Sequence, residues 1–226
     1  MRFFLTDIRR ALTERTFIVS VLIAFATLFG AFVYLGMSGG DNSFVKTQSL
    51  VFPFVAPFFA ALPFSAVIMT EKKTKYRDLI KLRRRGKNYI LPRFFTVGIA
   101  GGFALLLPEL FLLLITFLSD IPYTDCLKII TLAFPFGFAY AVLSFSLTFF
   151  NDEIILPLII PQVLYLLLTY AFPYLDLERF YPPLCISPYI FGEPDFMRIG
   201  AALCVTVLAA IIITLIGSVR EALQYV

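Results

Sequence analysis

The chain has 226 residues, of which 60% are hydrophobic and 15% are charged, with a formal net charge of +4. A soluble domain is nearer half apolar and a quarter charged, so lipid is the expected solvent for much of this surface. The absence of histidine excludes Ser-His catalysis, His-Glu-x-x-His metalloprotease chemistry and haem ligation through histidine. The three cysteines form no Cys-x-x-Cys pair, which argues against a zinc or redox site and leaves a Cys126–Cys185 disulfide open.

Residues 2–15 predict an amphipathic helix that lies among lipid headgroups and leads into a first membrane span. Its apolar face, at i, i+4, i+7 and i+8 spacing, consists of Phe4, Ile8, Ala11 and Leu12. Its arginines add positive charge. Because the segment combines an apolar face with positive charge, residues 1–16 are assigned as an interfacial helix. The alternatives are an ordinary basic flank that sets topology and a signal peptide. A cleaved signal peptide is disfavoured, because the following apolar run is long and lacks a clear Ala-x-Ala site.

Six apolar segments follow, each near the roughly 20 residues that cross about 30 Å of hydrocarbon as a helix. They are residues 17–36, 50–70, 94–118, 127–149, 154–174 and 199–217. Helices are expected because each segment then satisfies its own backbone hydrogen bonds in lipid. The predicted fold class is an all-α membrane protein with six transmembrane helices in a single transmembrane domain, residues 1–226. Residues 175–198, rich in Pro, Tyr and Phe, are expected to form a compact outer loop or short re-entrant helices.

The distribution of Lys and Arg predicts that both termini are cytoplasmic. With the amino terminus inside, the inner segments carry four arginines before residue 16, ten basic residues in 71–93 and Arg220. Those fifteen leave four of the nineteen Lys and Arg for the outer segments. Because the charges are segregated by loop, the positive balance does not indicate a nucleic-acid partner. The expected location is a bacterial plasma membrane that the chain crosses several times.

Residues 71–93, here called the basic loop, hold ten Lys and Arg between two expected spans. A short helix with a narrow apolar edge is predicted by the i, i+3, i+4, i+7 spacing of Tyr76, Leu79, Ile80 and Arg83, with Gly86 as its C-cap. A connection that only sets topology could be far shorter, as the turn at residues 151–153 indicates. The basic loop is therefore interpreted as a docking helix for a cytoplasmic partner. The alternative is a loop resting on anionic headgroups, worth ~1 kcal/mol per basic residue.

The whole chain resembles the membrane subunits of type-2 ABC transporters. The shared order is an amphipathic amino-terminal helix, six spans, a cytosolic helix after the second span and a Pro- and aromatic-rich element before the last. The residues that stand in the coupling-loop positions are Glu71, the Asp78-Leu79-Ile80 core, Arg83–Arg85, Tyr89 and Arg93. The Ile-Ser-Pro-Tyr of Ile186–Tyr189 resembles the Ser-Pro element before the sixth span. The common Gly-Thr pair early in the loop is missing, since only Thr74 is present, after Lys73.

The resemblance implies a transport subunit that is not an enzyme and holds no cofactor. The sequence agrees in having no Gly-x4-Gly-Lys-Ser/Thr phosphate loop. ATP and Mg would be bound by a separate ABC ATPase, expected in two copies, and a second membrane subunit, identical or homologous, would complete the pathway. The residues expected to couple to the ATPase are Glu71, Lys75, Tyr76, Arg77, Asp78, Leu79, Ile80, Arg83, Arg84 and Arg85. The Phe-rich spans favour export of an amphipathic or apolar cargo, such as a peptide, an antibiotic or a lipid-like molecule.

Polar residues inside the expected spans form a second set of candidates. Glu109 follows Pro108 within the third span, where a charged carboxylate costs on the order of 2.5–3.5 kcal/mol. It is expected to face protein or water, or to be protonated. The three roles left open are a pathway residue, a proton-coupling carboxylate and a partner in an interhelical hydrogen bond. Gln162 is a further candidate, more typical of packing.

Prolines and glycines in the spans predict how the helices pack. Prolines within the spans are Pro53, Pro57, Pro63, Pro108, Pro135, Pro157 and Pro161. Neighbouring helices are expected to satisfy the carbonyl groups that these prolines free. A small-residue face suited to close packing is formed on the third span by Gly98, Ala100, Gly101, Gly102 and Ala104.

Three other function classes remain open on the sequence alone. A secondary transporter or channel would use Glu109 and would depend on a proton gradient without ATP. A membrane enzyme is disfavoured by the lack of histidine and of an acidic cluster within the spans. A non-transporting membrane protein, such as an immunity or assembly factor, also fits the sequence.

Overall fold

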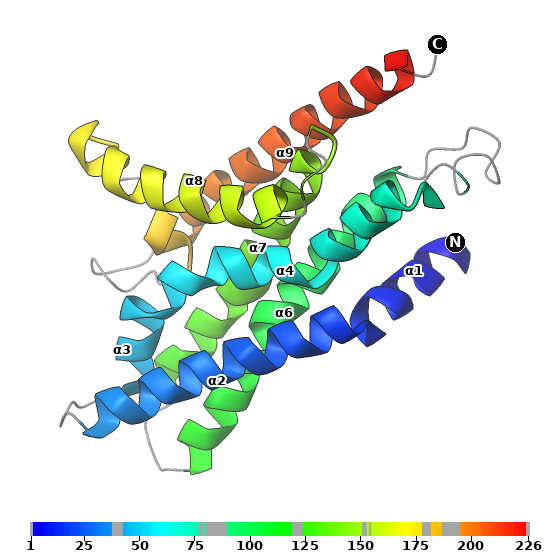
Figure 1. Ribbon diagram of the computed structural model, residues 1–226. Helices are drawn as coiled ribbons and strands as arrows, with labels where there is room; N and C mark the ends of the chain where they lie inside the picture. The colour runs from blue at the N-terminus through cyan, green and yellow to red at the C-terminus, as the bar shows by residue number, and fades with distance from the viewer. Residues whose placement is uncertain are drawn as a thin grey trace.

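A computed structural model describes residues 2–37, 43–76, 79, 90–118, 124–150, 153, 155–177, 182–186 and 195–224. Within these residues the chain forms eight α-helices and one 3-10 helix and no strand, which confirms the all-helical class (Figure 1). They are α1 (Arg2–Thr13), α2 (Arg15–Met37), α3 (Ser43–Leu50), α4 (Phe52–Lys73), α6 (Ile90–Leu118), α7 (Thr124–Leu147), α8 (Ile155–Tyr174), η2 (Pro182–Cys185) and α9 (Phe196–Gln224). Each long helix coincides with an apolar run, in which helical backbone groups pair with one another.

Several of these helices are compatible with a membrane-embedded, multi-pass protein. Five stretches of the described chain are long and apolar enough to cross a membrane. They are α2, α6, Ile130–Leu147 of α7, α8 and Phe196–Glu221 of α9. Four of the five are half buried or less in the bundle, and α7 is the exception at 72%. The helix at the centre of the bundle is therefore α7, with the other apolar faces turned outward.

The second expected span, residues 50–70, belongs to a bent pair of helices. α3 ends at Leu50, α4 begins at Phe52, and α3 meets the first part of α4 at an angle of 65°. A proline occupies the first turn of α4, where its missing N–H removes no helical hydrogen bond. The described helices thus provide five candidate spans, or six if the bent pair is one span, where the sequence predicted six.

α6 and α7 cross in close contact through their glycines. A Cβ added to Gly101 would lie 2.9 Å from the carbonyl oxygen of Gly137 in α7 and 2.8 Å from that of Ala60 in α4. Real side-chain atoms do not approach this closely, so the three backbones meet only because position 101 has no side chain. The predicted small-residue face of the third span is confirmed at this crossing.

Hydroxyl groups from neighbouring helices cover carbonyl groups that prolines leave unpaired. Pro161 has no N–H for the carbonyl oxygen of Pro157, and Ser144 Oγ donates to that oxygen at 2.7 Å. In α4, Ser20 Oγ donates at 3.3 Å to the carbonyl four residues before Pro63. The expectation that neighbouring helices satisfy freed carbonyl groups is confirmed at these two prolines.

A part of the expected outer loop packs against the bundle as η2. It contacts α8 and α9, and both Cys185 and Ile186 are buried. Burial raises the pKa of the Cys185 thiol to about 12, so the thiol stays protonated and unreactive near neutral pH. Cys185 is a free thiol, which leaves a disulfide with Cys126 without support.

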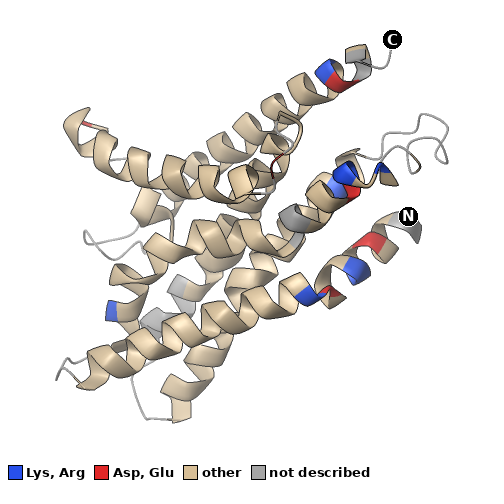
Figure 2. Ribbon diagram, viewed as in Figure 1, with Lys and Arg blue, Asp and Glu red and all other residues tan. Residues whose placement is uncertain are grey.

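Charged residues gather at one end of the bundle, here called the charged end (Figure 2). It comprises α1, the last turn of α4 and the last turns of α9. Lys72 Nζ of α4 donates to the carbonyl oxygen of Thr148 at 3.1 Å, just after α7. The Arg220 guanidinium of α9 lies 6.0 Å from the ring centre of Phe150. Helices far apart in the sequence are therefore tied together at the end that the charge count assigns to the cytoplasm.

Candidate functional site

Glu71, the first residue of the basic loop, lies in the last turn of α4. Its carboxylate is buried, with the residue only 4% exposed. Arg10 Nη1 of α1 donates to Glu71 Oε1 at 2.7 Å, and Arg93 Nη1 of α6 donates to Glu71 Oε2. One carboxylate therefore joins three helices.

Arg93, the last residue of the basic loop, is the centre of the same cluster. It lies in the first turn of α6 and is only 2% exposed, which is rare for arginine. Its Nε lies 3.6 Å from Asp7 Oδ2 of α1, and Asp7 is also buried. The four side chains of Asp7, Arg10, Glu71 and Arg93 are here called the ion cluster. Two positive and two negative charges give it a formal charge of zero.

The ion cluster holds the two ends of the basic loop against each other and against α1. A buried ion pair adds little net stability, because desolvation offsets the attraction, but removing one partner strands the other charge. Arg93 can stay buried because carboxylates from two different helices flank it. The last turn of α4, the first turn of α6 and α1 are therefore interdependent.

The sequence pattern of the amino-terminal helix did not predict the role of Asp7. In α1, Asp7 and Ala11 lie one turn apart and are both buried, whereas Leu5 is exposed. The side of α1 that faces α6 is therefore partly charged, because Asp7 on that side lies beside Arg93 and not against an apolar surface. A single acidic residue in the first half of a basic segment was the signal that could have found Asp7.

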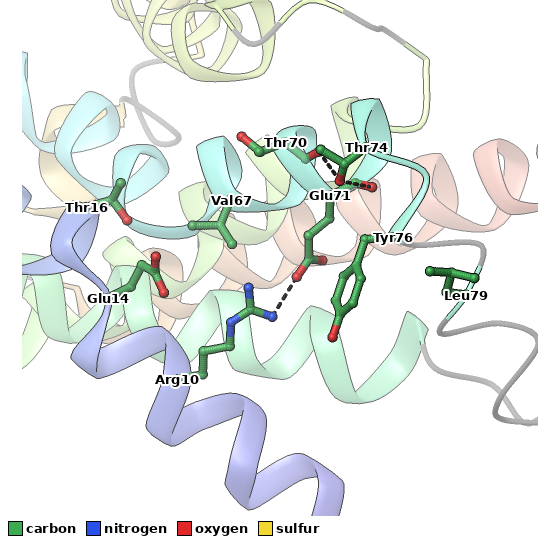
Figure 3. Close-up of a pocket in the computed structure, with 9 residues that line it drawn as sticks. All are labelled: Arg10, Glu14, Thr16, Val67, Thr70, Glu71, Thr74, Tyr76 and Leu79. Atoms are coloured by element: carbon green, nitrogen blue, oxygen red, sulfur yellow. Dashed lines mark hydrogen bonds and ion pairs between the residues drawn. The ribbon is translucent and has the colours of Figure 1, made fainter.

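A cavity of about 550 Å³ opens beside the ion cluster (Figure 3). It is lined by Arg10, Glu14, Thr16, Val67, Thr70, Glu71, Thr74, Tyr76 and Leu79. The hydrogen-bonded Arg10 and Glu71 lie between Glu14 on one side and the Tyr76 ring on the other. Both Tyr76 and Leu79 are exposed. Arginine and tyrosine, two residue types enriched at protein–protein interfaces, both line this cavity.

The basic loop leaves α4 through an abrupt turn at Lys75. This residue has a φ of 58°, a left-handed conformation at the position after a helix where glycine is usual. Its N–H donates to the Lys72 carbonyl at 3.1 Å, and the Leu79 N–H donates to the Lys75 carbonyl at 3.4 Å. The second bond has the spacing of a helical turn, where the short helix was predicted. Outside the described residues lie Arg77, Asp78, Ile80, Arg83, Arg84 and Arg85.

Glu109 is fully buried in α6, well away from the ion cluster. Gln48 Nε2 of α3, itself fully buried, donates a hydrogen bond to Glu109 Oε2. No basic side chain in the described part of the chain pairs with Glu109. The contact is an interhelical hydrogen bond, which is one of the three roles that the sequence left open for Glu109. Sequence reasoning missed Gln48, although an amide beside an expected span was a usable signal.

Gln162 of α8 binds the backbone of α4. Its Nε2 donates to the Phe54 carbonyl at 2.6 Å, and its Oε1 accepts from the Phe58 N–H at 3.2 Å. In a regular helix these two backbone groups pair with each other. The amide therefore joins the hydrogen-bond ladder of α4 beside Pro57, where a proline weakens it. Gln162 therefore has a packing role between α8 and α4.

No known protein family, curated protein or solved structure matches this chain. Across the residues that the structure describes, no group of three or more His, Cys, Asp or Glu is placed to hold a metal ion. Among the described residues, the ion cluster with its cavity and the Gln48–Glu109 pair are two candidate sites built from polar side chains.

Proposed function

We propose that this chain is the transmembrane subunit of an ATP-driven exporter of the type-2 ABC class, in a bacterial plasma membrane with both termini in the cytoplasm. The observation that carries the proposal is the ion cluster, which fixes both ends of the basic loop and α1 at one point. A loop that only sets topology needs no such anchor. A loop that transmits movement does need one, because a flexible joint would absorb the displacement.

The packing of the bundle supports transmission from the basic loop. A displacement of the loop would reach α4 through Glu71 and α6 through Arg93. Both helices pack on α7, and α4 also packs on α8. Because packed interiors are dense and barely compressible, a shift at the ion cluster would be passed to the centre of the bundle.

A type-2 ABC exporter also requires partner subunits, six spans and a cargo. A separate ABC ATPase, present in two copies, binds ATP and Mg and docks on the basic loop beside the cavity. A second membrane subunit, identical or homologous, completes the pathway. The bent α3–α4 pair acts as the second of six spans. The cargo is amphipathic or apolar, such as a peptide, an antibiotic or a lipid-like molecule.

Copurification from the native membrane tests the docking site with a matched pair of variants. Leu79 and Leu175 are both 61% exposed, but Leu175 follows α8, which is not one of the helices of the charged end. We expect an ABC ATPase to copurify with the wild-type chain and with Leu175→Asp. Recovery should fall roughly tenfold with Leu79→Asp, because a charge replaces the apolar contact that Leu79 would make with the ATPase. Absence of an ATPase from the wild-type complex would contradict the proposal, and so would full recovery with Leu79→Asp.

A secondary transporter remains the second candidate, because Glu109 is a carboxylate inside a span. Transport into proteoliposomes that hold this chain alone separates the two. Uptake driven by a proton gradient and lost in Glu109→Gln would favour the secondary transporter. Transport that requires an added ATPase and ATP would favour the exporter.

A further inference from the structure

Gln48 and Glu109 form an isolated polar pair between α3 and α6. Gln48 Nε2 and Glu109 Oε2 are joined by a hydrogen bond. The other two terminal atoms, Gln48 Oε1 and Glu109 Oε1, have no hydrogen-bond partner among the described residues. Two buried oxygen atoms therefore remain unsatisfied on neighbouring side chains.

A single proton would satisfy both atoms. An ionised carboxylate only accepts hydrogen bonds, so both oxygens would stay acceptors without a donor. A proton on Glu109 Oε1 turns that atom into a donor, and Gln48 Oε1 is the free acceptor on the side chain already bound. The acid and the amide would then be joined by two hydrogen bonds in a ring.

The surroundings of the pair favour a neutral acid. Leu105 and Leu112, one turn before and one turn after Glu109, are fully buried apolar neighbours on the same side of α6. A carboxylate in such a setting is costly unless it is paired, and no basic group of the described chain pairs with it.

Among the side chains that the structure describes, charged and titratable groups on the elements packed against α6 are engaged elsewhere or exposed. The side chains of Asp125 and Lys128 in α7 lie outside the described ones. Lys46 is the one charged residue of α3, and it is exposed. In α7, the Tyr140 ring stacks on Phe136. Tyr34 of α2 is also exposed. In α1, α4 and α6, Asp7, Arg10, Glu71, Lys72 and Arg93 are engaged in contacts at the charged end.

We propose that Glu109 is a proton-binding site, and that the protonated acid and Gln48 form a neutral ring that fastens α3 to α6. The short helix α3 is joined to α4 by the 65° bend. The ring therefore fixes one arm of the bend against the central helices. This site is separate from the ion cluster and does not depend on the proposed export function.

Infrared spectroscopy of the full-length protein, purified in a detergent without ester groups, tests the proton directly. At about pH 8, roughly four units above the pKa of an ordinary Asp or Glu, exposed carboxyl groups are ionised. We expect the wild-type protein to show the carbonyl stretch of a protonated carboxylic acid, and Glu109→Gln to lose it. Absence of this band from the wild-type protein would overturn the proposal, as would its survival in Glu109→Gln.

A second variant tests the pairing and does not depend on whether Glu109→Gln folds. Gln48→Leu keeps the acid but removes the amide that donates to its carbonyl oxygen. We expect the band to remain and to shift to higher frequency, because the carbonyl loses a hydrogen bond. The matched control Gln162→Leu removes an amide bound to α4 and should leave the band unchanged. An unshifted band in Gln48→Leu would overturn the ring.

Discussion

Two glutamates are buried among the described residues, Glu71 at the charged end and Glu109 deep in α6. Each is bonded to a side chain 61 positions away in the sequence, Arg10 in one case and Gln48 in the other. Glu71 also binds Arg93, so it is matched by two cations. Among the described side chains, Glu109 is matched by a neutral amide alone. The comparison shows two ways to bury an acid. Glu71 keeps its negative charge and pairs it with arginines, whereas Glu109 binds a proton and becomes neutral.

The location of each carboxylate explains the difference. Glu71 borders a cavity, and its partner Arg10 has a side chain that is 41% exposed. A charge there keeps some contact with polar surroundings. Glu109 is completely buried among apolar side chains. An uncompensated charge is least favourable at such a site, so protonation of Glu109 costs less free energy than burying its charged form.

Arg93→Met should have the largest effect, because it leaves Glu71 and Asp7 buried without their shared cation. We expect a loss of about 3–5 kcal/mol in the free energy of unfolding, measured by thermal or denaturant unfolding in detergent. The control is Arg198→Met, in which the lost partner Asp195 lies 2.7 Å away in an exposed pair. That pair should be worth about 0–1 kcal/mol. Equal losses would show that the ion cluster is not a buried network.

Exchanging each carboxylate for its amide compares the two sites directly. Glu71→Gln removes one of two negative charges from the ion cluster, and we expect a loss of about 2 kcal/mol. Glu109→Gln replaces a neutral acid by a neutral amide of the same shape, and we expect a loss of less than about 1 kcal/mol. Unfolding of the two variants under the same conditions is the measurement. A larger loss of stability in Glu109→Gln than in Glu71→Gln would contradict a charged carboxylate at position 71 and a neutral acid at position 109.

Arg10→Met should have the smallest effect within the ion cluster. Because the Arg10 side chain is 41% exposed, its pair with Glu71 is partly screened by solvent, and we expect a loss of less than about 1 kcal/mol. The loss should shrink further at high salt, whereas the loss in Arg93→Met should persist. Unfolding at low and high ionic strength checks this. A salt-independent loss as large as that of Arg93→Met would place both arginines in the same buried environment.

The positions of the long helices could be predicted from the sequence because they depend on local composition. The expected span at 154–174 corresponds to α8 (Ile155–Tyr174), and the one at 17–36 to α2 (Arg15–Met37). The ends of the basic loop were predicted less well. α4 continues to Lys73 and α6 begins at Ile90, so Glu71 and Arg93 are helical. Hydropathy marks where the hydrocarbon ends, whereas a helix can continue past that boundary.

The candidate site could be predicted only in part. Glu71 and Arg93 were named only as coupling-loop positions implied by the resemblance, and Glu109 by its charge in an apolar span. Asp7 and Gln48 were missed, because a partner across the bundle leaves no periodic signal near either residue. The two buried glutamates therefore looked unrelated in the sequence.

By itself, then, the sequence determined the helical class, the apolar segments and the segregation of positive charge, since these follow from properties of neighbouring residues. Only the tertiary structure decided which polar groups meet: Arg93 with Asp7 and Glu71, and Gln48 with Glu109. Those contacts depend on how helices cross, and the crossings depend on close approaches such as the one between Gly101 and Gly137. Burial then imposes the need for a partner, and the packing selects which residue supplies it.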